Sequence, residues 1–123
     1  MDGTLPDADV RLDQAAALFN QGEHHACHDV VEALWREERA PVRDLYKGLL
    51  QIAVALLHWA RGNRRGALRL LDSGAALCAP FAPVAQGIDL AALLAEVRVC
   101  REALLTGKPS PDPSCAPRIR PAL

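Results

Sequence analysis

Residues 42–61 read VRDLYKGLLQIAVALLHWAR and carry the strongest structural signal of this chain. From Leu49 to Leu57, apolar side chains fall on every face of a helix except at Gln51, a pattern typical of a helix with neighbours all round. The uncharged part, residues 48–60, is too short to cross a bilayer, because a membrane span needs about 20 apolar residues. The stretch therefore predicts the central helix of a soluble bundle.

The composition of the whole chain agrees with such a bundle. Half of the 123 residues are hydrophobic, which suffices for the core of one domain. Ala and Leu make up a third of the chain and only 4% of the residues are aromatic, so helix formers outnumber strand formers. The formal net charge of −1 excludes the basic excess with which nucleic-acid-binding proteins neutralise phosphates. We expect an all-α fold and no nucleic-acid partner.

Periodicity and helix-end signals predict four further helices around the central one. Pro41 ends the helix before it, because proline lacks an amide donor, and Asp89 is a good N-cap for the last helix. The predicted helices cover residues 7–20, 23–39, 64–79 and 89–106. Together with the central helix they predict a compact bundle of about five helices, built from antiparallel hairpins.

Two segments lack helical periodicity. Residues 80–88 are expected to form a linker, and residues 108–123 hold five of the nine prolines. Such a proline-rich segment is expected to be an extended or mobile tail. The sequence therefore predicts a single helical domain, residues 1–107, followed by a mobile Pro-rich C-terminal tail.

A weak internal repeat relates the first two hairpins. Gly22 and Gly62 each lie between two helices, and Cys27 and Ala67 follow them at the same offset of five residues. This pattern is similar to the helical hairpin of tetratricopeptide repeats, so a solenoid is one interpretation. A closed bundle is the favoured one, because the central helix is too long for such a repeat and has His58 where an aromatic residue is usual.

The sequence has neither paired cysteine motifs nor a segment that resembles an export signal. The four cysteines stand singly, without a C-x-x-C pair, so neither a disulfide framework nor a thiolate zinc site is expected. The acidic N-terminal residues do not resemble an export signal. We therefore expect a cytoplasmic protein without a membrane partner.

Polar residues on the second and third helices form the candidate site. His28 and Glu32 are four residues apart and stack along one helix stripe, followed by Trp35. Gln51 and His58 are seven residues apart and share one face of the central helix. If the two helices form an antiparallel hairpin across Pro41, these residues lie at similar heights and can converge.

Such a cluster suits a divalent metal. His28, Glu32 and His58 offer the imidazole and carboxylate ligands that zinc or a similar cation accepts, with positions left open for water. His28 and Glu32 are then the candidate catalytic residues, with Gln51 as a ligand or substrate donor and Trp35 as a pocket wall. A bound cation lowers the pKa of water and makes it a nucleophile, so the hypothesis is a metal-dependent hydrolase with an unknown small-molecule substrate.

A structural interpretation of the same residues stays open. A histidine four residues from a glutamate is also an ordinary helix pair worth a few tenths of a kcal/mol. Gln51 and His58 can satisfy each other or backbone carbonyls inside the core. In that case the chain is a non-catalytic helical interaction module, whose buried polar cluster fixes the register of its helices.

Several motifs of residues 15–77 resemble the small all-helical family called domain of unknown function 309. The motifs are F-N-x-G at residues 19–22, H-D-x-x-E-x-x-W at residues 28–35 and G-L-x-Q at residues 48–51, followed by a histidine at position 58. Members of this family are sometimes labelled predicted metal-dependent hydrolases. By motif position, the resemblance implies that the family's characteristic polar residues are His28, Glu32, Gln51 and His58.

Other surface features allow two interpretations each. His24 and His25 stand where the family usually has aromatic residues, and are either packing residues or additional ligands. A group of arginines on the fourth helix is expected to be a solvated face, or else a patch for an anion or an acidic partner: Arg64, Arg65 and Arg69. Apolar residues of the last helix either cap the bundle or meet a second subunit in a homo-oligomer: Leu90, Leu93, Leu94, Val97 and Leu104.

Overall fold

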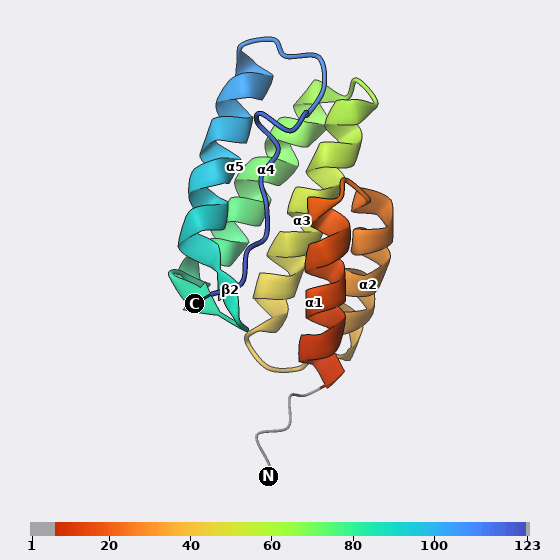
Figure 1. The fold of residues 1–123 in the computed structure, drawn as a ribbon, viewed down its shortest axis with the longest axis vertical. Helices are drawn as coiled ribbons and strands as arrows, with labels where there is room; N and C mark the ends of the chain where they lie inside the picture. Colours follow the sequence, from red (N-terminus) through yellow and green to blue (C-terminus); the bar gives the residue numbers. More distant parts are fainter. Residues whose placement is uncertain (1–6, 123) are drawn as a thin grey trace.

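A computed structural model describes residues 7–122, which form five helices that follow one another in an antiparallel bundle (Figure 1). The helices are α1 (Asp7–Asn20), α2 (His24–Glu37), α3 (Arg43–Ala60), α4 (Arg64–Cys78) and α5 (Leu90–Leu105). Each helix packs against the next along the chain. The all-α bundle predicted from the sequence is confirmed, and the helix boundaries differ from the prediction only at terminal residues.

The helix α3 lies at the centre and packs against both α2 and α4. Its side chains Leu45, Leu49, Ile52, Leu56 and Trp59 are buried, as its continuous apolar pattern predicts. No helix within residues 7–122 is long and apolar enough to cross a membrane.

Two glycines allow α3 and α4 to approach closely. A Cβ atom at Gly48 would lie 2.6 Å from the Sγ atom of Cys78 and 2.8 Å from the carbonyl oxygen of Gly74. A Cβ atom at Gly74 would in turn lie 2.9 Å from the carbonyl oxygen of Gly48. These distances are shorter than van der Waals contact, so the helix crossing requires glycine at both positions.

The turns after α1 and after α3 have the same backbone structure. Gly22 and Gly62 adopt φ angles of +82° and +84°, which glycine reaches without the steric cost that other residues meet. The residue after each glycine donates its N–H to a carbonyl five residues back, over 2.9 Å from Glu23 to Leu18 and 2.8 Å from Asn63 to His58. The internal repeat seen in the sequence is therefore a repeated helix–turn–helix.

The predicted linker contains short regular elements. It comprises the 3₁₀ turn η1 (Ala79–Phe81) and a two-stranded antiparallel hairpin of β1 (Val84–Ala85) and β2 (Ile88–Asp89). Asp89 then starts α5, and its Oδ1 atom accepts a hydrogen bond of 2.9 Å from the N–H of Ala92. The predicted N-cap is thus confirmed.

The last helix caps the bundle within the same chain. Leu90, Leu93, Val97 and Leu104 are buried, so these apolar residues contact the core of this chain. All four cysteines are free and buried, and burial raises the pKa of the Cys27, Cys78 and Cys100 thiols to about 12. Thiols with such pKa values are poor nucleophiles and poor metal ligands at neutral pH.

The C-terminal segment, which the sequence predicts to be an extended or mobile tail, packs against the helices as an extended chain. Residues 108–122 run between α5 and α1 down to β2, and Cys115 and Ile119 are buried against the helices (Figure 1). The side-chain amide of Asn20 forms two hydrogen bonds with the backbone of Ile119. Its Nδ2 atom donates to the Ile119 carbonyl over 2.7 Å, and its Oδ1 atom accepts from the Ile119 N–H over 2.8 Å. Prolines prevent helix formation here, but they do not prevent the segment from packing as an extended chain.

Candidate functional site

The structure brings His28 and Glu32 together on α2. The Nε2 atom of His28 lies 3.2 Å from Glu32 Oε2, and these side chains are 26% and 28% exposed. The Nη2 atom of Arg36, one helical turn further along, lies 2.5 Å from the other carboxylate oxygen of Glu32, Oε1. His28 Nδ1 also lies 3.2 Å from Asp29 Oδ1. The pair is therefore part of a charged network along a single helix.

Gln51 and His58 have partners on a different side of the bundle. The Oε1 atom of Gln51 accepts a hydrogen bond of 2.5 Å from the Ser73 hydroxyl on α4. The Nδ1 atom of His58 lies 3.3 Å from the Nδ2 atom of Asn63, which begins α4. Both side chains on the shared face of α3 thus contact α4 or its N-cap, whereas His28 and Glu32 lie on α2.

The expected three-ligand set is not assembled in the structure. Within residues 7–122 no group of three or more His, Cys, Asp or Glu side chains is arranged to hold a metal ion. The hairpin geometry predicts the heights of His28, Glu32 and His58 along their helices. It does not predict the rotation of α3 about its own axis, and that rotation directs His58 toward the start of α4. His28, Glu32 and His58 are therefore not grouped in the described part of the chain, and their roles as metal ligands and the catalytic roles of His28 and Glu32 stay predictions.

Trp35 packs against the start of α3. The guanidinium carbon of Arg43 lies 4.1 Å from the centre of the Trp35 ring, and Arg43 Nε donates to the Trp35 carbonyl over 3.0 Å. The Nε1 atom of Trp35 is buried, and no described residue accepts a hydrogen bond from it. Trp35 therefore joins α2 to α3 through a cation–π contact, and its expected role as a pocket wall stays a prediction.

The two additional histidines of α2 have different environments. His24 is half-buried and contacts Phe19 edge to face, with 5.2 Å between ring centres. Burial lowers the pKa of His24 below its usual value of 6.5, although the nearby Glu23 opposes this shift. The side chain of His25 is 71% exposed and lies 3.6 Å from Asp29. His24 thus packs against Phe19, as expected of a packing residue, which is one of the two interpretations made from the sequence.

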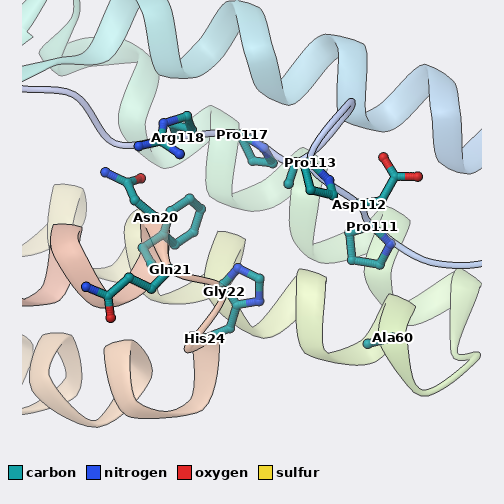
Figure 2. A pocket seen from close by; sticks show the side chains of 12 residues that line it. Asn20, Gln21, Gly22, His24, Ala60, Pro111, Asp112, Pro113, Pro117 and Arg118 are labelled. Atoms are coloured by element: carbon teal, nitrogen blue, oxygen red, sulfur yellow. The ribbon is translucent and has the colours of Figure 1, made fainter.

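A pocket lies between the α1–α2 turn and the C-terminal segment (Figure 2). It has a volume of about 420 Å³. Phe19, Gly22 and His24 form one wall, and Figure 2 shows the imidazole of His24 directed toward the C-terminal segment. The opposite wall consists mainly of apolar groups from that segment: Pro111, Pro113, Ala116 and Pro117.

Two polar side chains of this pocket already have partners. The Asn20 amide binds the backbone of Ile119 through both of its polar atoms. Hydrogen bonds from Ser114 and Lys108 lower the pKa of Asp112 to about 2, so this carboxylate stays ionised and paired. The side chains of Gln21, His24 and Arg118 also line the pocket, and none of them has a hydrogen-bond or ion-pair partner among the described residues. Three polar side chains thus remain for a ligand in a mainly apolar cavity.

Sequence reasoning did not identify this pocket. Its second wall comes from residues 111–118, which were expected to belong to an extended or mobile tail. One signal was available, because Asn20 and Gly22 belong to the F-N-x-G motif. The role of Arg64 was also missed. Its Nη1 atom donates to the Lys108 carbonyl over 2.7 Å and its Nη2 atom donates to Leu104, so it holds the end of α5 instead of facing solvent.

Comparisons with known proteins show which family the first half of the chain resembles. Residues 12–70, from α1 into α4, match the family model described as Domain of unknown function (DUF309). The chain is also 40% identical over 61 residues to the uncharacterized protein YpuF of Bacillus subtilis (strain 168). That match covers 49% of this chain and 35% of YpuF, so the chain spans about a third of that relative. The resemblance seen in the sequence motifs is thereby confirmed, since residues 12–70 of this chain match the DUF309 family model.

Proposed function

We propose that this domain is a non-catalytic binding module that holds a small aromatic ligand in the pocket between the α1–α2 turn and residues 111–118. The pocket itself carries the proposal. Its volume of about 420 Å³ falls in the range of about 300–1,000 Å³ that is usual for small-molecule sites. Its lining combines apolar walls with a few polar groups, as such sites do.

The chemistry of the walls selects the ligand. The rings of Phe19 and His24 meet edge to face on one side, and proline rings lie on the other. A flat aromatic ring fits between such walls and buries its faces against them. The neutral imidazole of His24 is available for one hydrogen bond, and Arg118 is available for an anionic substituent. The best ligand is therefore a small aromatic molecule with an anionic or hydroxyl group.

The contacts of the other polar residues support a non-catalytic role. Gln51 joins α3 to α4 through Ser73, close to the Gly48–Gly74 crossing, where a Cβ atom on either glycine would overlap the other helix. His58 binds Asn63 at the start of α4. These contacts suit side chains that fix helix register, because Gln51 and His58 each have a hydrogen-bond partner within the fold.

The metal-dependent hydrolase stays the second candidate, favoured by the 3.2 Å separation of His28 Nε2 and Glu32 Oε2. These two residues supply fewer ligands than the three protein ligands that catalytic zinc sites generally have. Calorimetric titration of the untagged chain with zinc separates the two candidates. The binding module predicts no stoichiometric zinc uptake that depends on His28. One equivalent of zinc that is lost in a His28→Ala variant would instead support the hydrolase.

An NMR titration tests the pocket directly. 4-Hydroxybenzoate and indole serve as anionic and neutral aromatic probes of the isotope-labelled chain. We expect saturable shifts of the Gln21, Gly22 and His24 amides, with tighter binding of 4-hydroxybenzoate. An Ala60→Phe variant fills the pocket from its edge and should abolish these shifts, because Ala60 lines the cavity.

The matched control is Ala76→Phe, which adds the same ring at an exposed position of α4 that does not line this pocket. It should bind both probes like the unmodified chain. The proposal fails if neither probe shifts these amides at millimolar concentration, or if the Ala60→Phe variant binds as well as Ala76→Phe.

A further inference from the structure

A second hollow lies at the turn between α3 and α4, and its lining shares no residue with the proposed aromatic site. Its volume is about 260 Å³. Its lining consists of the following residues: His58, Asn63, Arg65, Gly66, Arg69 and Leu70. Two of these are arginines and none is acidic, so the hollow has a cationic lining.

The two arginines have no partners within the fold. Arg65 and Arg69 are exposed, and neither forms an ion pair or hydrogen bond with any residue in the described part of the chain. Their neighbour Arg64 is different, since it is bound to backbone carbonyls at the end of α5. Arg65 and Arg69 are one helical turn apart, so both guanidinium groups can approach one ligand from the same side.

The hydrogen bonds of Asn63 determine which His58 nitrogen carries the proton. Asn63 Oδ1 accepts from the N–H of Gly66 over 3.0 Å, so the Nδ2 atom of Asn63 is the one that faces His58 and donates to its Nδ1 atom over 3.3 Å. A neutral imidazole that accepts at Nδ1 has its proton on Nε2. His58 therefore offers an N–H donor in the same hollow as the two arginines.

The repeated turn provides a comparison within the same chain. At the α1–α2 turn, the positions equivalent to Asn63, Arg65 and Arg69 are occupied by three other residues: Glu23, His25 and Asp29. His25 and Asp29 lie 3.6 Å apart and pair with each other. The two turns have the same backbone structure, but the first has carboxylates at Glu23 and Asp29 and the second has unpaired arginines at Arg65 and Arg69. The turn geometry therefore does not require positive charge at these positions.

We propose that the hollow at the α3–α4 turn binds the phosphate group of a small molecule. Guanidinium groups bind phosphate oxygens through paired, charge-assisted hydrogen bonds, and His58 Nε2 can donate to a further oxygen. The hollow is smaller than the usual drug-sized pocket of about 300–1,000 Å³, and Leu70 provides an apolar edge. Free phosphate and a small phosphomonoester share this chemistry.

An NMR titration at low ionic strength tests the site with inorganic phosphate and glycerol 3-phosphate as probes. The expected result is a saturable shift of the Arg65, Gly66 and Arg69 amides. An Arg65→Gln/Arg69→Gln variant should bind at least about tenfold more weakly, because it loses two charged donors. Tighter binding of glycerol 3-phosphate than of phosphate would assign the site to a phosphomonoester, and equal affinity would assign it to free phosphate.

Two further variants make the test specific. Arg39→Gln/Arg98→Gln removes the same charge from exposed positions outside the hollow and should keep the affinity within about twofold of the unmodified chain. Arg65→His/Arg69→Asp introduces the residues that the first turn already tolerates, and should fold normally without binding phosphate. Equal weakening in the two glutamine variants, or shifts that do not saturate, would overturn the proposal.

Discussion

His24 shows how the fold changes the chemistry of one side chain. Burial against Phe19 lowers its pKa below 6.5, so the folded chain binds a proton at this site less readily than the unfolded chain. As the pH falls through 6.5, the unfolded state takes up this proton first, and the free energy of unfolding decreases until the folded imidazole is also protonated. His24 therefore destabilises the domain at acidic pH and has little effect above neutral pH.

A His24→Phe variant tests this effect. It keeps an aromatic ring beside Phe19 and removes the titration, so its Tm should fall less than that of the unmodified chain between pH 7.5 and 5.0. Thermal melts of both chains across this range measure the difference, and the pH dependence of the His24 ring signals gives its pKa. Parallel curves of Tm against pH in the two chains would contradict the prediction.

The contact between α3 and α4 depends on two small residues and one polar pair. Gly48 and Gly74 face each other so closely that a Cβ atom at either position overlaps backbone atoms of the other helix. Gln51, three residues after Gly48, is bound to Ser73, the residue before Gly74. The glycines permit the close approach, and the hydrogen bond fixes the register at which it occurs.

A Gly48→Ala variant should lower the free energy of unfolding by about 1–3 kcal/mol, because crowding in a packed core outweighs the better helix propensity of alanine. Chemical denaturation measures this change. Adding Cys78→Ala to the variant should recover only part of the loss, since it removes the 2.6 Å contact with sulfur and leaves the 2.8 Å contact with the Gly74 carbonyl. A Gly48→Ala chain that is more stable than the parent would show that the helices can separate at little cost.

The C-terminal segment packs across several helices of the molecule. Residues 108–122 connect parts of the chain that are distant in sequence, since Trp59 Nε1 donates to the Lys108 carbonyl over 2.9 Å and Ile88 pairs with Pro121. Nearer the C-terminus, the N–H of Arg118 donates a hydrogen bond of 2.9 Å to the Oε1 atom of Glu96 on α5. The segment thereby joins α1, α3 and α5, and it also forms one wall of the proposed ligand pocket.

An Asn20→Ala variant should release this segment. It leaves the part-buried N–H and C=O groups of Ile119 without their partner, at a cost of about 1–3 kcal/mol. We expect faster trypsin cleavage after Arg118 and a lower Tm. The control is Gln21→Ala, which changes the exposed neighbour of Asn20 and removes no hydrogen bond to the segment. Equal cleavage rates in the two variants would show that Asn20 does not hold the segment in place.

The candidate site could be predicted only in part. Spacing along one helix correctly predicts that His28 and Glu32 lie side by side, because residues four apart in a helix share a stripe. Spacing also predicts that Gln51 and His58 share a face of α3. It does not predict which neighbour that face contacts, and in the structure the contacts are Ser73 and Asn63. Relative rotation depends on how side chains of two helices fit together, which neither helix encodes alone.

The positions of the five helices, their turns and the buried face of each were determined by the sequence itself. Helix propensity, apolar periodicity and glycine turns act over a few neighbouring residues, so they can be read without knowing the rest of the molecule. The packing of the C-terminal segment and both hollows were decided only by the tertiary structure. The Asn20–Ile119 bonds join residues 99 positions apart, and no local pattern in either stretch specifies the other as its partner.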